Sequence, residues 1–173
     1  MPQVHFVTKN KAGKTVVCGR PGCAKKIEPG DKYYHWSFRY GGKHYRCTAH
    51  SPRSSERTQS KMSGAYAAIE SVEDALKTAT ALEDFTGALE SAADDIESVR
   101  DEYQDSFDNM PENFQGGSTG EEIQEKRDGL DSFADTLRTA ASTIEDEWEN
   151  NKEEKRAQAA HQTAEDALSE FEF

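Results

Sequence analysis

The chain has 173 residues, enough for one or two small domains. Only 34% of the residues are hydrophobic and 31% are charged, which excludes a single large hydrophobic core. The net charge of -12 is divided unevenly, because residues 1–60 hold 12 lysines and arginines against 3 acids (+9), whereas residues 61–173 hold 9 against 30 (-21). This division predicts either two units with different partners or a chain that folds back on itself, with the basic unit resting on the acidic helices.

All three cysteines lie in the first 47 residues, and disulfide pairing would leave one thiol over. The first residues lack the basic and apolar segments of a signal peptide, and no apolar run approaches the length of a membrane span. We therefore expect a cytoplasmic chain with no membrane association. In a reducing cytoplasm, clustered cysteines indicate a metal site more often than a disulfide.

Residues 1–50 have the pattern of strands and turns. The β-prone segments 4–7 and 15–17 flank a polar stretch at 9–14, which predicts a hairpin between them. The clearest strand, 32–40, places Tyr34, Trp36, Phe38 and Tyr40 on one face and Tyr33, His35, Ser37 and Arg39 on the other. Glycines 41 and 42 predict a two-residue turn with positive φ, followed by a partner strand over 43–47.

From about residue 61 the apolar residues recur at helical spacing. Residues 51–60 have the composition of a linker, or begin a helix after Pro52. Thr80 and Glu83 match a capping box at the start of a long helix. The short stripe before this box consists of Tyr66, Ile69, Val72 and Leu76, and the long stripe after it of Phe85, Leu89, Ala92, Ile96, Val99, Tyr103 and Phe107.

A second long helix follows a turn at 110–117. Ser118 or Thr119, with Glu121 or Glu122, is expected to cap it. Its stripe is Ile123, Leu130, Phe133, Leu137, Ala140 or Ala141, Ile144 and Trp148. The two long helices are predicted to pack as an antiparallel, coiled-coil-like hairpin, with the short helix, a second copy of the chain or another partner covering the remaining apolar surface.

Four residues have the spacing of a metal site: Cys18 and Cys23 are separated by four residues, and Cys47 and His50 by two. Zinc takes four such ligands in a tetrahedron, and Gly19-Arg20-Pro21-Gly22 allows the chain to bend around it. A fifty-residue β unit has too little core to fold without such a cross-link. His35 and His44 are rivals of His50, and His44 is the better rival, although it lies within a strand.

The predicted fold class is thus α+β, with a small β-rich, treble-clef-like zinc finger before a long antiparallel helical hairpin. The predicted divisions are a zinc-binding domain at 1–53, a linker and short helix at 54–79, the hairpin at 80–149 and a polar helical tail at 150–173. Four protein ligands leave no open position on the metal, so we expect no catalysis. The sequence also lacks the deaminase, phosphate-loop and nucleophile-elbow motifs.

The stretch from Cys18 to Cys23, the turn Ile27-Glu-Pro-Gly-Asp31, the aromatic strand and Cys47-Thr-Ala-His50 resemble zinc fingers of the poly(ADP-ribose) polymerase type. Those fingers bind DNA breaks, so the resemblance implies nucleic-acid binding. Here the first pair has four intervening residues instead of two, and the last pair runs Cys then His. Over most of its length, and especially in residues 57–70, the chain also resembles tailed-phage proteins without an established activity.

Basic and aromatic side chains around the predicted strand suit nucleic acid or a host protein, because cations meet phosphates and rings stack on bases. The candidate contacts are Arg20, Lys25, Lys26, Tyr33, Arg39, Lys43 and Arg46. The alternative is that the rings form the core and the lysines only keep the surface soluble. For the face that carries Trp36 we favour the core, and for the surface of Tyr33, Arg39 and Lys43 the two interpretations are even.

The acidic helices admit three interpretations: a solvated face around the helix seam, a docking surface for a basic protein, or an imitation of DNA that blocks a nucleic-acid enzyme. The acidic end with Phe171 and Phe173 resembles the partner-binding tails of single-stranded DNA-binding proteins. The leading hypothesis is a phage-encoded, non-enzymatic zinc adaptor, whose finger binds nucleic acid or a host protein. Its helices would mediate docking or homo-oligomerisation. The alternative is a phage inhibitor of a host defence or nucleic-acid enzyme, acting in the host cytoplasm.

Overall fold

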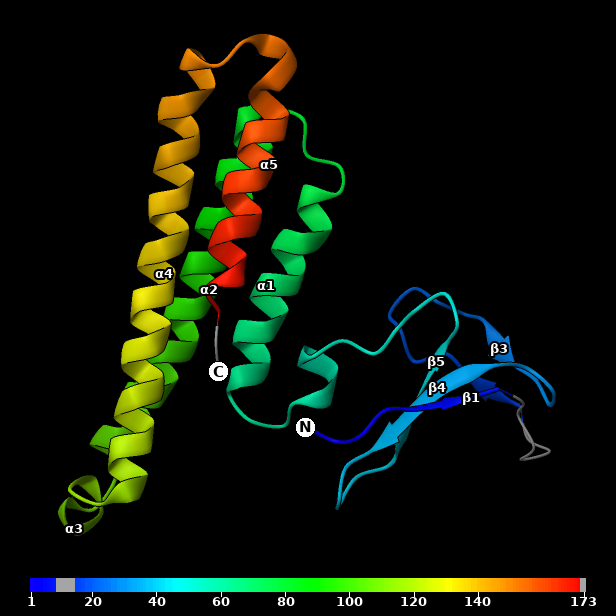
Figure 1. Cartoon of the computed structure of the whole chain (residues 1–173). Helices are drawn as coiled ribbons and strands as arrows, with labels where there is room; N and C mark the ends of the chain where they lie inside the picture. Colours follow the sequence, from blue (N-terminus) through cyan, green and yellow to red (C-terminus); the bar gives the residue numbers. More distant parts are fainter. Residues whose placement is uncertain (9–14, 172–173) are drawn as a thin grey trace. The chain divides into compact units, whose positions relative to one another are not determined.

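The computed structural model describes residues 1–8 and 15–171 and has the α+β class that the sequence predicts. The chain divides into two compact units, a first unit of Met1–Ser63 and a second unit of Gly64–Phe173. The described strands lie in the first unit, and the long helices make up the second (Figure 1). The first unit therefore extends beyond residue 53, where the sequence placed its end.

The first unit contains two small antiparallel sheets. Strand β4 (Tyr33–Ser37) lies between β1 (His5–Val7) and β5 (Lys43–Cys47), whereas β2 (Val16–Val17) pairs with β3 (Lys26–Ile27). The predicted hairpin of segments 4–7 and 15–17 is therefore wrong, and its polar stretch at 9–14 lies outside the described residues. Local composition indicates strands, but the apolar surface that each strand covers determines its partner.

The connection between β4 and β5 is longer than predicted. Ser37 pairs with Lys43, so residues 38–42 form the loop, in which the Gly41 N–H donates to the Phe38 carbonyl at 3.2 Å. Neither Gly41 nor Gly42 has a positive φ, so the predicted two-residue glycine turn is wrong. The alternation of faces consequently ends at Ser37, and the Tyr40 ring is 91% exposed at the loop tip.

Each face of β4 contributes one buried ring. Tyr33 belongs to a core with Cys18, Ile27 and Cys47. Trp36 lies on the opposite face with no exposed surface, as predicted for this side, and its ring stacks on His44 at 5.2 Å between centroids. The core on the Tyr33 side of the sheet thus contains two of the predicted metal ligands, Cys18 and Cys47.

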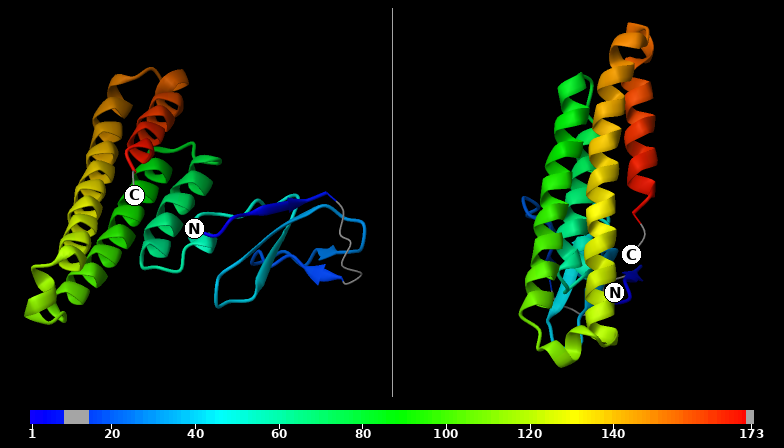
Figure 2. Two further views of the ribbon diagram at one scale, coloured as in Figure 1. Left: turned by 60° about the horizontal axis from the view of Figure 1, so that its bottom comes forward. Right: turned by 90° about the vertical axis from the view of Figure 1, so that its left-hand side faces the viewer.

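The second unit consists of helices that lie side by side in Figures 1 and 2. These are α1 (Met62–Leu76), α2 (Leu82–Asp108), α4 (Ser118–Asn150) and α5 (Glu153–Ser169), with the short α3 (Glu112–Gln115) in the turn between α2 and α4. Helices α2 and α4 run antiparallel, because Phe85 near the start of α2 contacts Trp148 near the end of α4. The buried residues of both helices include most of the two predicted stripes, from Phe85 to Tyr103 and from Leu130 to Ile144.

Helices α1 and α5 cover this pair from within the same chain. The predicted polar tail is largely the helix α5, which buries Ala160, Ala164 and Ala167, since small side chains allow close helix packing. The Phe171 ring packs against Tyr66 and Phe133, with centroids 5.5 and 4.9 Å away. Phe173 lies outside the described residues.

The helix starts differ in detail from the predicted caps. Helix α2 begins at Leu82, and the Asp84 carboxylate accepts the backbone N–H groups of Thr80 and Ala81 at 2.9 and 3.0 Å. Helix α4 begins after Gly117 without a side-chain cap, so the predicted capping by Ser118 or Thr119 is wrong.

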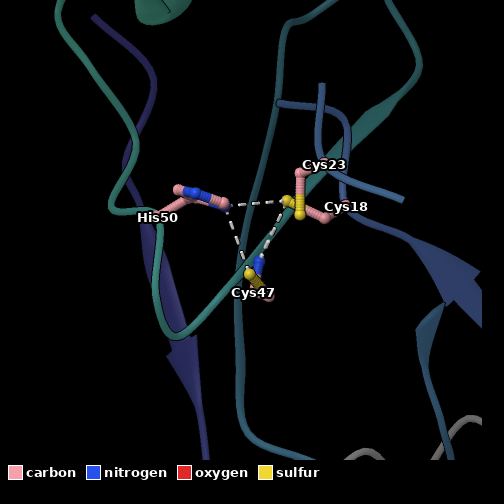
Figure 3. Close-up of side chains that lie close together, drawn as sticks. All are labelled: Cys18, Cys23, Cys47 and His50. Atoms are coloured by element: carbon pink, nitrogen blue, oxygen red, sulfur yellow. Dashed lines mark hydrogen bonds between the residues drawn. The ribbon is translucent and has the colours of Figure 1, made fainter. Parts of the chain in front are cut away.

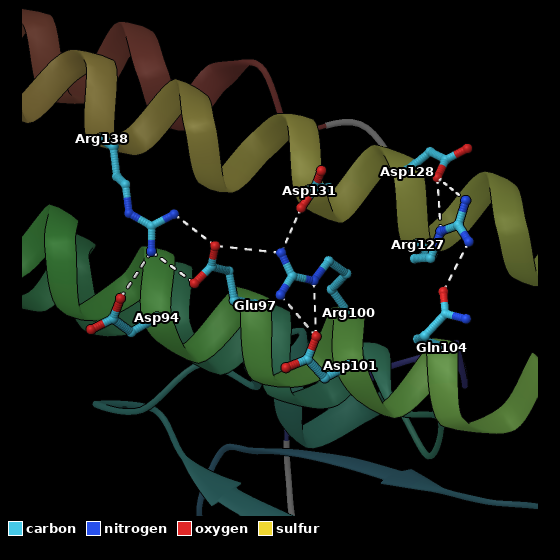
Figure 4. A network of polar contacts seen from close by, with 9 residues as sticks. All are labelled: Asp94, Glu97, Arg100, Asp101, Gln104, Arg127, Asp128, Asp131 and Arg138. Atoms are coloured by element: carbon cyan, nitrogen blue, oxygen red, sulfur yellow. Dashed lines mark hydrogen bonds and ion pairs between the residues drawn. The ribbon is translucent and has the colours of Figure 1, made fainter. Parts of the chain in front are cut away.

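Three arginines line the seam between α2 and α4 (Figure 4). Arg138 donates to Glu97 and Asp94, Arg100 donates to Asp131 at 2.6 Å, and Arg127 donates to Gln104 at 2.9 Å. These contacts offset part of the acidic charge that the two helices concentrate. Among the described residues, no helix is both long enough and apolar enough to cross a bilayer.

Candidate metal centre

The first ligand pair lies on a tight turn that its own sequence favours. The Cys23 N–H donates to the Arg20 carbonyl at 2.9 Å, which closes a turn with Pro21 and Gly22 at its centre. Gly22 has φ +77°, a left-handed conformation that glycine adopts without strain, and proline suits the position before it. The turn therefore returns Cys23 to the side of Cys18.

The second ligand pair lies where β5 ends. Cys47 is the last residue of β5, and the His50 N–H donates to the Cys47 carbonyl at 2.9 Å. This turn carries the imidazole back towards the Cys47 thiol. A further bond, from the Gly19 N–H to the Tyr45 carbonyl at 2.9 Å, holds the first turn against β5.

The four side chains converge on one point (Figure 3). Their ligand atoms all lie within 4.8 Å of one another, and His50 Nδ1 is 3.7 Å from Cys18 Sγ and 3.4 Å from Cys47 Sγ. A tetrahedral ion with metal–sulfur bonds of about 2.3 Å and a metal–nitrogen bond of about 2.0 Å requires sulfur–nitrogen edges of roughly 3.5 Å. Cys18, Cys23, Cys47 and His50 are thus close enough to hold a metal ion.

The surroundings favour a thiolate at Cys18. Burial acts to raise the pKa of this thiol, but backbone N–H groups of Cys47 and Arg20, together with His50, outweigh it and lower the pKa to about 6. One of these bonds, from the Cys47 N–H to Cys18 Sγ, measures 3.4 Å. Burial raises the pKa of the Cys47 thiol, so a thiolate at Cys47 would need a nearby positive charge such as a bound metal ion.

The rival histidines lie elsewhere. His44 stacks on Trp36, and His35 stacks on His5 at 5.1 Å between centroids. In the described part of the chain, His50 is the imidazole that joins the three cysteines.

A buried ion pair supports the second ligand turn, and sequence reasoning missed it. Arg46 precedes Cys47, and its Nε and Nη2 donate to Glu56 at 3.1 and 2.7 Å. Glu56 belongs to the 3-10 helix η1 (Ser55–Arg57). This helix lies in the segment 51–60, which the sequence predicted to be a linker or the beginning of a helix. The sequence does contain a signal for this ion pair, because Glu56 is an acid that follows the ligand pair closely within a strongly basic region.

Gly19 allows a close approach to Arg46. A Cβ at this position would lie 2.5 Å from Arg46 Nη1, so the guanidinium, which two bonds join to Glu56, would have to shift. The turn that carries Cys18 and Cys23, called here the knuckle turn, therefore packs directly against the Arg46–Glu56 ion pair.

The predicted contact residues separate into three groups by exposure. Lys25, Lys26, Arg39 and Lys43 are exposed. Arg20 is partly covered, with its Nη1 3.7 Å from Glu56. The candidates that do not lie on the surface are Tyr33, 8% exposed, and Arg46, 6% exposed; both are part of the interior of the first unit.

Comparisons of the chain with protein-family models, curated proteins and solved structures find no match.

Proposed function

We propose that the metal is zinc and that the site is structural. Three thiolates and one imidazole are the ligands that zinc prefers, and closed sets of four protein ligands are typical of structural zinc. The knuckle turn, the β4–β5 hairpin and the ligand pair at its end support a treble-clef-like finger. The observation that carries the proposal is the convergence of Cys18, Cys23, Cys47 and His50.

We infer a non-enzymatic adaptor whose first unit binds nucleic acid. Residues 1–63 hold 13 lysines and arginines against 3 acids, a balance of +10, and one of those acids, Glu56, is engaged by Arg46. Exposed cations that lack enough acids to neutralise them attract a polyanion and release its counterions on binding. Filled coordination of the metal leaves no site for an activated water, which supports a role without catalysis.

The second unit is proposed to dock on a basic partner through its charge. Residues 64–173 hold 30 acids against 8 lysines and arginines, a balance of -22. The apolar stripes of α2 and α4 are buried within the chain itself, so charge is the better basis for docking than a shared helix seam. The same acidic surface favours the second candidate function, inhibition of a nucleic-acid enzyme by imitation of DNA. A phage origin and a reducing host cytoplasm fit either function.

The metal proposal is tested by elemental analysis of the purified full chain. We expect one zinc ion per chain, and loss of the β-sheet signals when the ion is chelated. A chain that purifies without metal and keeps those signals would contradict the proposal.

Nucleic-acid binding is tested by fluorescence anisotropy with a labelled oligonucleotide at several salt concentrations. The double variant Lys25→Glu/Lys26→Glu should weaken binding and flatten its salt dependence. Its matched control, Lys155→Glu, changes an exposed lysine of α5 and should have little effect. If nucleic acid does not bind but the chain inhibits a nucleic-acid enzyme, the second function replaces the first.

A further inference from the structure

The first unit has a hollow of about 450 Å³ beside the end of β4. Ser37, Phe38 and Arg39 line one side of it, and Arg57, Thr58 and Ser60 line the other. The Arg46–Glu56 pair fixes η1 against the sheet, and this places the residues that follow Glu56 at the hollow. The hollow is therefore built from two segments that the fold of the first unit holds together.

The lining carries positive charge and no acid. Within residues 1–8 and 15–171, neither Arg39 nor Arg57 forms an ion pair. Arg57 Nη2 donates to the Pro2 carbonyl at 3.3 Å, whereas its Nε is buried without any hydrogen-bond partner in that described part. Two arginine side chains in the lining, with no carboxylate among the lining residues, favour a ligand that supplies anionic oxygens.

An exposed ring follows the lining residues Phe38 and Arg39 in the chain. Tyr40 follows Arg39 in the loop, is 91% exposed, and has the Arg39 guanidinium carbon 5.2 Å from its ring centroid. An exposed tyrosine with a cation beside it provides a stacking surface for an unpaired base. Phosphate-binding and base-stacking groups thus lie on consecutive residues.

We propose that this hollow binds one phosphate of single-stranded nucleic acid, with Arg39 and Arg57 on the phosphate and a neighbouring base on Tyr40. The inference rests on the proposed nucleic-acid function and specifies the strand form and the residues that bind it. The proposal predicts that the first unit prefers unpaired to paired strands, because a base within a duplex is not free to stack on Tyr40.

The experiment measures the affinity of the zinc-loaded full chain for a fluorescent oligodeoxythymidine and for a duplex of equal length, across a salt series. Arg39→Gln should weaken single-strand binding and reduce the slope of log affinity against log salt by about 0.7. Tyr40→Ala should weaken single-strand binding about tenfold and leave duplex binding unchanged. Both side chains are exposed, so these variants are expected to fold, and Lys155→Gln in α5 serves as the matched control.

Arg57→Gln and Arg57→Lys form a second pair, checked by zinc content and thermal unfolding. Arg57→Gln should weaken binding at unchanged zinc content, and Arg57→Lys should restore part of it. One outcome would overturn the hollow as the binding site but leave the proposed function standing. In that outcome the wild type binds, Lys25→Glu/Lys26→Glu weakens the binding, and Arg39→Gln and Tyr40→Ala bind as tightly as the wild type. Absence of binding by the wild type overturns both.

Discussion

At the scale of single residues, the first unit depends on a charge buried beside the metal ligands. Arg46 is 6% exposed, lies at 5.2 Å over the Trp36 ring, and has Glu56 as its anionic partner. A buried guanidinium without its carboxylate keeps the cost of leaving water but loses the compensating bonds. Glu56 therefore stabilises the turn that carries Cys47 and His50, although it does not touch the metal site.

Glu56→Gln should accordingly destabilise the first unit by about 1–3 kcal/mol, because the amide replaces a charged acceptor of Arg46. The measurement is the chelator concentration needed to remove zinc, together with thermal unfolding of the first unit. Glu28→Gln, at an exposed position in the same unit, is the control. Equal zinc retention by the two variants would show that the ion pair does not support the ligand turn.

The candidate metal ligands were predictable from the sequence, whereas the residues that hold the ligand turns in place were not. The spacing of Cys18, Cys23, Cys47 and His50 identified the cluster because each pair fits one turn. Glu56 and Gly19 contribute through contacts with Arg46, and such contacts depend on how separate segments pack. For the same reason the aromatic alternation correctly placed Trp36 in a core but did not show that Tyr33 is also buried.

At the scale of elements, the connection between α2 and α4 depends on a close backbone contact. A Cβ on Gly120, in the first turn of α4, would lie 2.0 Å from the Gln115 carbonyl oxygen. Backbone atoms cannot move aside as a flexible side chain can. Gly87, within α2, has open space around it instead.

These two glycines give opposite predictions for the same substitution. Gly120→Ala should destabilise the second unit by about 1–3 kcal/mol, as overpacking does. Gly87→Ala should stabilise it by up to about 1 kcal/mol, because alanine favours a helix more than glycine. Thermal unfolding followed by the helical circular-dichroism signal measures both, and a stabilising Gly120→Ala would contradict the close contact.

The arginine seam between α2 and α4 predicts a pH dependence. Hydrogen bonds from Arg138 hold the pKa of Glu97 below its usual value of 4.5. A carboxyl with a lowered pKa stabilises the folded state above its unfolded pKa, and this contribution is lost as the pH falls through the folded pKa. The melting temperature of the second unit should therefore decrease as the pH is lowered below about 4.5. This decrease should be less steep in Glu97→Gln than in the control Glu90→Gln, which changes an exposed residue of the same helix.

The long helices and their antiparallel pairing were predictable from periodicity and the short connection between them, but strand pairing and the packing of α5 were not. The stripe of Phe85, Leu89 and Ile96 is buried as predicted because helical spacing is local. The partner of β1 lies far along the chain, and the partner of β2 is a strand of only two residues, so local composition could not indicate either pairing. Helix α5 was underestimated because its buried face consists of alanines, which give a weak apolar signal.

At the scale of the whole molecule, the two units draw their stability from different sources. The first unit has a small core around Cys18, Ile27, Tyr33 and Cys47, whereas the second buries long apolar stripes. A core of that size is insufficient without a cross-link, and helix packing needs no metal.

Cys47→Ser should therefore abolish stable zinc binding and the order of the first unit, while most of the helical circular-dichroism signal remains. Heteronuclear NMR of the full chain would record loss of dispersed β-sheet resonances beside unchanged helical ones. Cys47→Ser is compared with Ser51→Ala, an exposed change near the ligand turn that should retain the ion. Collapse of the helical signal in Cys47→Ser would show that the helices depend on the metal.

The two tryptophans of the chain are distributed one to each unit, and this gives the molecule its own optical reporters. Trp36 is sealed within the first unit, and Trp148 lies against Phe85 in the second. In a Trp148→Phe chain, the red shift of indole emission on chelation reports the opening of the first unit alone. Single-tryptophan variants thus permit each unit to be followed by its own fluorescence, without an attached dye.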